Sequence, residues 1–94
     1  MTVSVRLAEV LRPYAEGATV VELECPDPAT IGTVLDALDA QHPGVGRRVR
    51  DEGGAVRTHV NVFVGPDNVR DLDGLSTVVP AGVEVALLPA VSGG

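Results

Sequence analysis

The chain has 94 residues, which is enough for one domain and too few for two. Hydrophobic residues make up 45% of it, but Tyr14 and Phe63 are the only aromatic ones, so Val, Leu and Ala must fill the core. The formal net charge of −6 argues against a nucleic-acid partner and favours a protein partner with a basic docking face.

The N-terminal part of the chain predicts two strands. Residues 2–7 and 19–25 alternate between apolar and polar side chains, as half-buried strands do. Residues 11–17 contain a proline and a glycine and are predicted to be a loop, so the strands should form a hairpin with a long connection. Cys25 is the only cysteine and is expected to be a buried, inert thiol.

One amphipathic helix of about three turns is predicted next. The segment Pro26-Asp27-Pro28 breaks the second strand, and Thr30 can cap the helix that follows. Apolar side chains then recur at the helical spacing, at Ile31, Val34, Leu35 and Leu38. Pro43-Gly44 should end the helix, which is too short to be stable unless it packs on a sheet.

Residues 45–58 have no clear period. A turn of helix at 45–49 and a loop at Gly53-Gly54 are expected. The charged residues at the centre of this stretch are Arg47, Arg48, Arg50, Asp51 and Glu52. The three arginines either form a small basic patch or belong to a solvated loop that the two acidic residues partly neutralise.

Two long strands are predicted in the C-terminal half, at residues 59–64 and 83–88. A turn at 65–68 separates the first of them from a short return strand at Val69 and Arg70. The remaining stretches should be a connector at 71–77, anchored by Leu72 and Leu75, and a turn at Pro80-Ala81-Gly82.

This order of elements predicts an α+β fold, in which a mixed sheet of four to five strands packs on one helix. The helix stripe should face one side of the sheet. The inward side chains of the sheet should then be Val3, Val5, Leu7, Val21, Leu23, Val60, Val62, Val64, Val85 and Leu87.

One helix leaves the other face of the sheet open to water, and this face should also carry apolar side chains. Strand parity points Phe63, Ala86 and Leu88 away from the helix. They either form a contiguous patch that docks a partner or are scattered surface hydrophobic residues, which are common.

Taken together, the elements resemble a β-grasp, ubiquitin-like domain of the MoaD/ThiS sulfur-carrier family. The resemblance covers essentially the whole chain and is carried by the following segments: 29–38 with His42-Pro43; Val60-Asn61-Val62-Phe63-Val64; Asp73-Gly74-Leu75; 80–85; and Leu88-Pro89-Ala90-Val91-Ser92-Gly93-Gly94. It is closest to the CysO-like branch, carriers that feed sulfur to cysteine biosynthesis, because Leu11-Arg12-Pro13 follows the first strand and the segment between helix and third strand is long.

The resemblance implies that the reactive group is the carboxylate of Gly94. A ThiF/MoeB-type enzyme would use ATP to adenylate it, and a sulfur donor, rhodanese-like or sulfide, would convert it to a thiocarboxylate that a sulfur-accepting synthase consumes. Residues 89–94 are then a flexible tail, in which Pro89 ends the strand, the segment Ala90, Val91 and Ser92 is a spacer, and Gly93 and Gly94 lack Cβ atoms and can enter a narrow channel. The resemblance also implies that residues 1–94 form one domain, that the carrier itself binds no cofactor, and that it is a cosubstrate rather than an enzyme.

Three alternatives remain open: the small subunit of molybdopterin synthase, a modifier joined through Gly94 to target lysines, and a binding module whose Gly-Gly end is incidental. The sequence contains no Lys that could capture an activated C-terminus, which counts against a modifier that forms chains. His42 and His59 lack ligand partners at useful spacing, so no metal is expected. No signal peptide or membrane span is recognised, and a cytoplasmic protein is expected.

Overall fold

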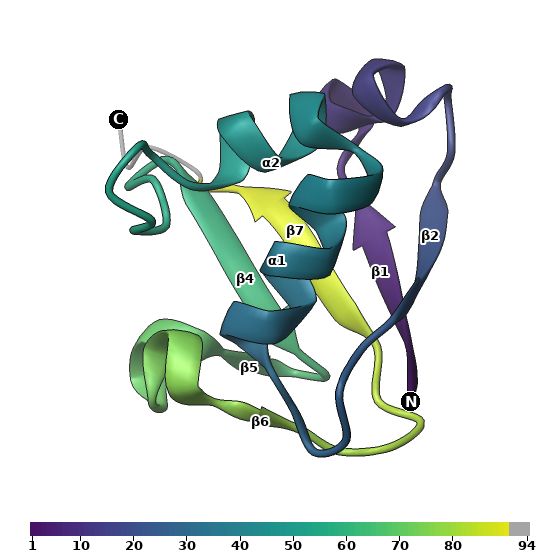
Figure 1. Cartoon of the computed structure of the whole chain (residues 1–94). Helices are drawn as coiled ribbons and strands as arrows, with labels where there is room; N and C mark the ends of the chain where they lie inside the picture. Colours follow the sequence, from purple (N-terminus) through teal and green to yellow (C-terminus); the bar gives the residue numbers. More distant parts are fainter. Residues whose placement is uncertain (91–94) are drawn as a thin grey trace.

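The computed structural model describes residues 1–90 and shows a five-stranded mixed sheet that packs on helices (Figure 1). The strands lie in the order β2-β1-β7-β4-β5. Their bounds are β1 Thr2–Leu7, β2 Val20–Glu24, β4 Val60–Val64, β5 Asp67–Asn68 and β7 Val85–Pro89. The pair β1·β7 is parallel and the other neighbours are antiparallel, so the α+β fold and the hairpin are confirmed.

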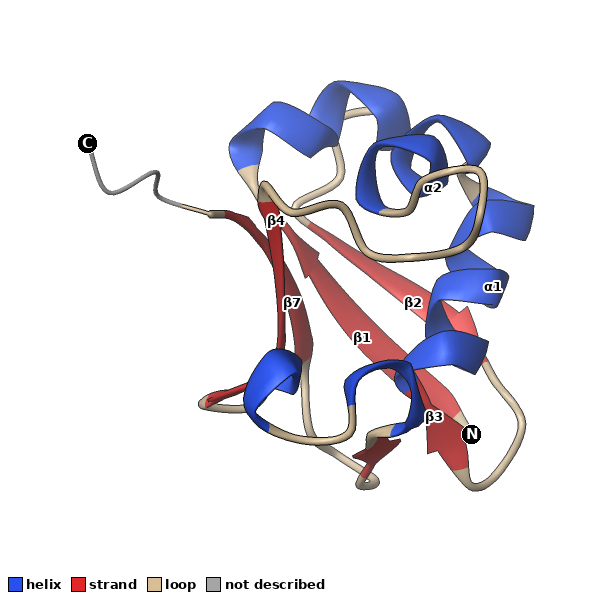
Figure 2. Cartoon of the chain, turned by 90° about the vertical axis from the view of Figure 1, so that its left-hand side faces the viewer, coloured by secondary structure: helices blue, strands red, loops and turns tan. Residues whose placement is uncertain are grey.

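Helices cover one face of this sheet and leave the other open, as Figure 2 shows from the side. The helix α1, Ile31–Gln41, begins at the predicted cap, where the Thr30 side chain accepts from the Thr33 amide and the Thr33 side chain accepts from the Thr30 amide. Its apolar stripe is buried as predicted. No helix in the described residues is long and apolar enough to cross a membrane.

The core contains every inward side chain expected from strand parity, and these side chains are all buried. The structure adds several buried residues that the pattern did not single out: Leu11, Ala15, Ala29, Val45, Val49, Val69 and Val79. Two of them, Leu11 and Ala15, lie in a segment that was expected to be a loop.

Two segments are more regular than expected. Residues expected to be a loop form the 3-10 helix η1, Glu9–Ala15, because Leu11 and Ala15 turn inward and pack on the core. The predicted helical turn is a longer helix, α2, Pro43–Val49. Pro43 is the first residue of α2 and thereby separates the two helices. A proline is tolerated at this position because the N–H that it lacks would have no hydrogen-bond partner in the first turn of a helix.

The return strand was placed too late in the chain. β5 already begins at Asp67, directly after a tight turn at Gly65-Pro66, and Val69–Asp71 form the 3-10 helix η2. Of the two anchors expected in the connector, Leu75 packs against the core, whereas Leu72 is exposed and anchors nothing. The connector contains the 3-10 helix η3, Gly74–Ser76.

A second, two-stranded sheet was missed altogether. It pairs β3, Ala29–Thr30, with β6, Val78–Val79, in antiparallel register. The chain before α1 and the chain before β7 are thereby joined at the lower end of the molecule in Figure 1. Two-residue strands have no readable alternation, so only the fold reveals the pairing.

Candidate functional site

The C-terminal strand delivers the end of the chain from the middle of the sheet. β7 lies between β1 and β4, with Ala86 opposite both Arg6 and Phe63. Beyond β7, the Ala90 amide donates a hydrogen bond of 2.8 Å to the carbonyl oxygen of His59. The described chain therefore remains attached to β4 up to Ala90.

This attachment corrects the role expected for Pro89 and Ala90. Pro89 is the last residue of β7, as expected, but it is still paired opposite Val60 and does not turn the chain away from the sheet. The Ala90 amide bonds to His59, directly before β4, and the Leu87 carbonyl accepts from the Ala8 amide on the β1 side. By the alternation of a ladder, the nitrogen of Pro89 faces the β1 side, where β1 has already ended at Leu7. A missing N–H costs nothing at that place.

The predicted docking residues lie together on the open face of the sheet. Phe63 is directly opposite Ala86, and Leu88 is two residues further along β7. Directly opposite and diagonal positions on one face are close enough for large side chains to touch. Leu88 is 38% exposed, and Phe63 and Ala86 are partly exposed. We call these three residues the outer patch; it adjoins the point where the chain leaves the sheet.

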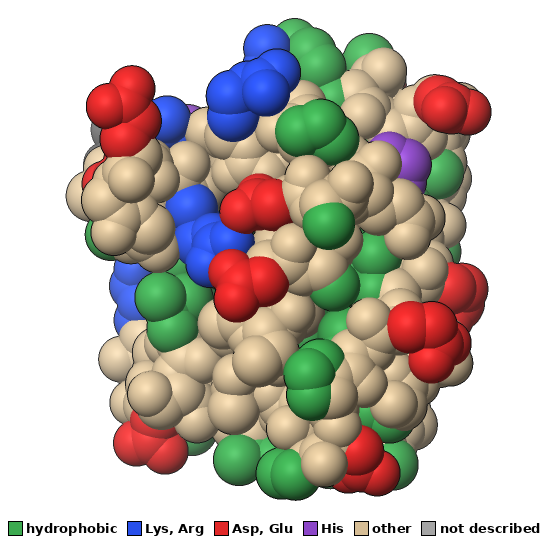
Figure 3. Space-filling model, viewed as in Figure 1, with side chains coloured by type: hydrophobic (Ala, Val, Ile, Leu, Met, Phe, Trp, Pro, Cys, Tyr) green, Lys and Arg blue, Asp and Glu red, His purple; other side chains and the backbone are tan. Residues whose placement is uncertain are grey.

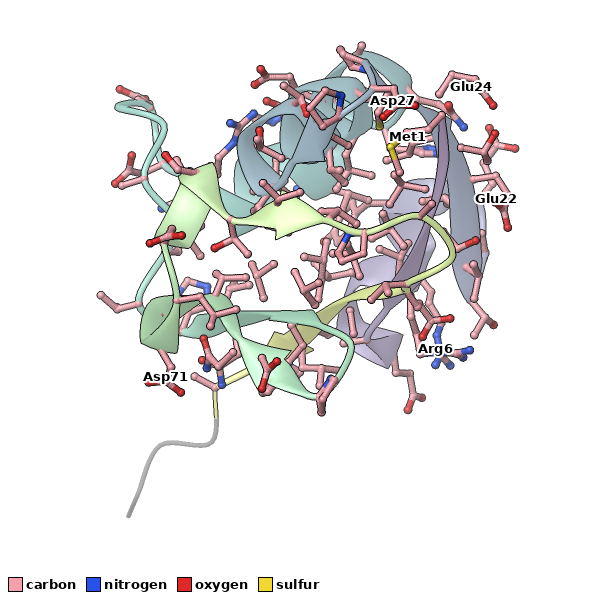
Figure 4. All side chains as sticks on the ribbon, turned by 90° about the horizontal axis from the view of Figure 1, so that it is seen from below. Met1, Arg6, Glu22, Glu24, Asp27 and Asp71 are labelled. Atoms are coloured by element: carbon pink, nitrogen blue, oxygen red, sulfur yellow. The ribbon has the colours of Figure 1, made fainter. Side chains whose placement is uncertain are left out.

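An ion pair borders the outer patch. The Arg6 Nε donates to Glu84 Oε1 at 2.8 Å, and both side chains are exposed. The hydrogen bond with Glu84 and its negative charge raise the pKa of Arg6 above its ordinary value. Figure 4 shows Arg6 on the side of β1 away from α1, the face that carries the patch. The pair gives this side of the patch a polar rim.

Sequence reasoning missed a polar network on the other side of the patch. The Arg70 guanidinium donates to the carbonyl oxygens of Val60, at 2.7 Å, and Arg57, at 3.1 Å, and also to the side chain of Asn61. Asn68 donates to the same Asn61 oxygen at 3.3 Å. Because Asn61 is the cross-strand partner of Leu88, this network fixes the strand beside the patch. The outward parity of Asn61 was the only signal in the sequence.

The arginines of the central stretch do not belong to a solvated loop, because Arg47 and Arg48 lie exposed in α2 and Arg50 follows it directly. Arg50 is neutralised from α1, since its Nη2 bonds Asp36 at 2.9 Å and Asp39 at 2.5 Å, and its side chain is only 12% exposed. The pKa of Arg50 is raised by these two carboxylates, against the opposing effect of burial. Neither Asp51 nor Glu52 pairs with it; Asp51 instead accepts from amides of its own loop.

Cys25 is buried, as predicted, and burial raises the pKa of its thiol above the ordinary value. A thiol of this kind is a poor nucleophile at neutral pH. Within residues 1–90 no group of three or more His, Cys, Asp and Glu side chains could hold a metal ion. The predicted reactive residue Gly94, with Gly93 and the predicted spacer residues Val91 and Ser92, lies outside the described part of the chain.

A family model described as the ThiS family matches residues 5–94. Sulfur carrier protein CysO of Mycobacterium tuberculosis is 34% identical over 96 residues, covering all of both chains. The molybdopterin synthase sulfur carrier subunit of the same organism is 36% identical over 73 residues, which cover 78% of this chain and 74% of that protein.

Solved structures share the fold over nearly the whole chain. A chain in the crystal structure of the Amycolatopsis orientalis BexX/CysO complex superposes with a TM-score of 0.84, at 32% identity, covering 98% of this chain and 99% of that one. The crystal structure of SAMP1 from Haloferax volcanii superposes with a TM-score of 0.83, at 33% identity, over all of both chains. The β-grasp architecture is thus confirmed.

Proposed function

The chain belongs to the ThiS family of ubiquitin-like sulfur carriers, and on this premise we propose that it carries sulfur as a thiocarboxylate on Gly94. The observation that carries the proposal is the extent of the match, which runs through the sheet to the Gly-Gly end at residue 94. Full-length similarity to a CysO protein favours cysteine biosynthesis as the pathway that consumes the sulfur.

The chemistry requires activation by a second protein. An α-carboxylate has a pKa near 3.5, so at neutral pH it is an anion and a poor electrophile. A ThiF/MoeB-type enzyme would let a Gly94 oxygen attack the α-phosphate of ATP, releasing pyrophosphate. Sulfide would then attack the acyl carbon, expel AMP and leave the thiocarboxylate; the persulfide of a rhodanese-like donor would first form an acyl disulfide with the same loss of AMP, and a thiol would reduce its S–S bond to release the thiocarboxylate. A sulfur-accepting synthase would take the sulfur from the resulting thiocarboxylate.

The geometry supports separate roles for the domain surface, which would bind the partner, and for the chain end, which would react. The described pairing runs through Pro89 and the Ala90 bond, four residues before Gly94. Four residues can span at most about 14 Å, at roughly 3.3–3.6 Å each. A partner must therefore approach the domain closely to reach Gly94, which brings it against the outer patch beside Leu88. Binding energy gained there can drive the reaction at the chain end.

The test is the intact mass of the protein after incubation with ATP, sulfide and the ThiF/MoeB-type enzyme of the source organism. We expect the mass gain of one oxygen replaced by sulfur, and no gain in a variant that lacks Gly94 but keeps the wild-type circular dichroism. Replacement of Leu88 with Asp should raise KM for loading while leaving the fold intact. A wild-type protein that remains a carboxylate under these conditions would refute the proposal.

Two other fates of an activated Gly94 give different products. A stable complex with a large molybdopterin synthase subunit, and transfer of sulfur to a pterin precursor, would assign the chain to molybdenum cofactor synthesis. Gly-Gly remnants on lysines of other proteins would identify a modifier. The similarity to a molybdopterin synthase sulfur carrier subunit makes the first of these the principal alternative.

A further inference from the structure

An apolar groove lies between η1 and the end of β7, on the other side of Leu88 from Phe63. Its volume is about 140 Å³, and its walls include Val10, Leu11, Leu88 and Pro89. Val10 is 65% exposed although it is a large aliphatic residue. A cavity of roughly 150 Å³ holds a molecule of the size of benzene, so the groove can take one large apolar side chain.

Among the described residues that line this groove, one carries a formal charge, and it is positive. Arg48 is the charged side chain among the groove residues, in a protein whose formal net charge is −6. Its guanidinium carbon lies 3.4 Å from the centre of the Tyr14 ring, and its Nη1 donates to the Gly44 carbonyl at 2.9 Å. Figure 3 shows basic side chains over the top of the molecule, where α2 lies.

Arg48 is held in place before any partner arrives. Tyr14 packs so closely on Gly44 that a Cβ there would lie 3.3 Å from the Tyr14 Cβ. The ring in turn supports the guanidinium through a cation–π contact, while the Gly44 carbonyl fixes one of its nitrogens. A side chain fixed in advance loses less entropy on binding, and arginine is a frequent anchor of protein interfaces.

We propose that this groove binds an apolar side chain flanked by a carboxylate on the adenylating enzyme, with the apolar group between Val10 and Leu88 and the carboxylate on Arg48. This inference rests on the proposed function. The groove and the outer patch share Leu88, so one partner can cover both while it takes the chain end that leaves beside Pro89.

The charges of the reacting groups indicate that the groove binds the adenylating enzyme rather than the sulfur acceptor. Adenylation brings the anionic carboxylate of Gly94 to the triphosphate of ATP, and like charges repel at short distance. The chain end therefore contributes little favourable energy to this encounter. The binding energy must come from the body of the carrier, and the groove combines apolar contact with a fixed positive charge beside the exit.

The experiment compares two groove variants with two matched controls in ATP–pyrophosphate exchange by the adenylating enzyme of the source organism. The groove variants are Val10→Asp and Arg48→Glu. Val78→Asp makes the same substitution at a valine that is 56% exposed on β6, far from the groove. Arg47→Glu makes the same charge change at a neighbouring exposed arginine that does not line the groove. Circular dichroism establishes that all four are folded.

We expect kcat/KM to fall at least tenfold in each groove variant, mainly through KM, and to change less than about threefold in each control, because anchor side chains dominate interface energies. Equal losses in groove variants and controls, or a loss confined to transfer to the acceptor, would overturn the inference. If wild-type protein is not adenylated at all, the proposed function itself fails. Direct binding of the four variants to the enzyme without ATP, by calorimetry, then still tests the groove.

Discussion

Leu87 and Leu88 are neighbours in sequence on opposite faces of β7, and this difference gives a sharp test of the register. Leu87 is fully buried in the core, opposite Val62, whereas Leu88 lies on the outer face and is 38% exposed. We therefore compare Leu87→Ala with Leu88→Ala, which remove the same atoms from two sides of one strand.

The loss of unfolding free energy should be at least three times larger in Leu87→Ala than in Leu88→Ala. In Leu87→Ala the lost burial and the cavity left between sheet and helices should lower the free energy of unfolding by about 3–5 kcal/mol. At roughly 4–8 °C per kcal/mol for a domain of this size, Tm should fall by more than about 12 °C. Leu88→Ala leaves no closed cavity and loses only part of its burial, so about 1 kcal/mol is expected.

Urea unfolding followed by far-UV circular dichroism measures both values, and the loading reaction of the proposed function measures KM. We expect Leu87→Ala to lose stability with little change in KM in the folded protein. Leu88→Ala should lose little stability and raise KM. If Leu88→Ala proved as destabilising as Leu87→Ala, the register and the outer patch would both be wrong.

Three further predictions concern the helices and the core. Gly46→Ala would place a Cβ 1.6 Å from an Asp39 carboxylate oxygen, so unfolding measurements should show a loss of about 1–3 kcal/mol, although helix propensity alone predicts a gain of about 1 kcal/mol. Thr30→Ala removes the side-chain acceptor for the Thr33 amide and should cost about 1 kcal/mol by the same assay; no loss would mean that the cap does not stabilise α1. Burial raises the pKa of the Cys25 thiol above its ordinary value of 9.0, so the folded state keeps the proton longer. The free energy of unfolding should thus fall as pH rises above about 9, and this part of the slope should vanish in Cys25→Ala, as urea titrations at several pH values would show.

Local patterns determined the main elements of the fold. Alternation located the long strands and assigned each side chain to a face, because successive residues of a strand point to opposite sides whatever the strand pairs with. The stripe of α1 and its Thr30 cap are equally local, since both depend on residues within a few positions. For the same reason, the outward direction of Phe63, Ala86 and Leu88 followed from the sequence.

Pairings between distant segments could not be predicted in this way. Nothing near Arg50 in the chain indicates that Asp36 and Asp39 will neutralise it from another helix, and local charge balance pointed to the wrong partners. The short strands β3 and β6 and the helix η1 exist because tertiary contacts bury Ala29, Val79 and Leu11. Segments of two or three residues gain their stability from such contacts and not from their own pattern.

Pro89 shows where sequence and tertiary structure divide. The sequence determined that a proline without an N–H follows Leu87 and Leu88, and it predicted a break in the strand there. Only the arrangement of β1, β4 and β7 decided that the missing donor faces the side where β1 has ended, while Ala90 still bonds to His59. A proline disrupts a ladder only where a neighbouring strand needs its donor, and the position of that neighbour is a property of the fold.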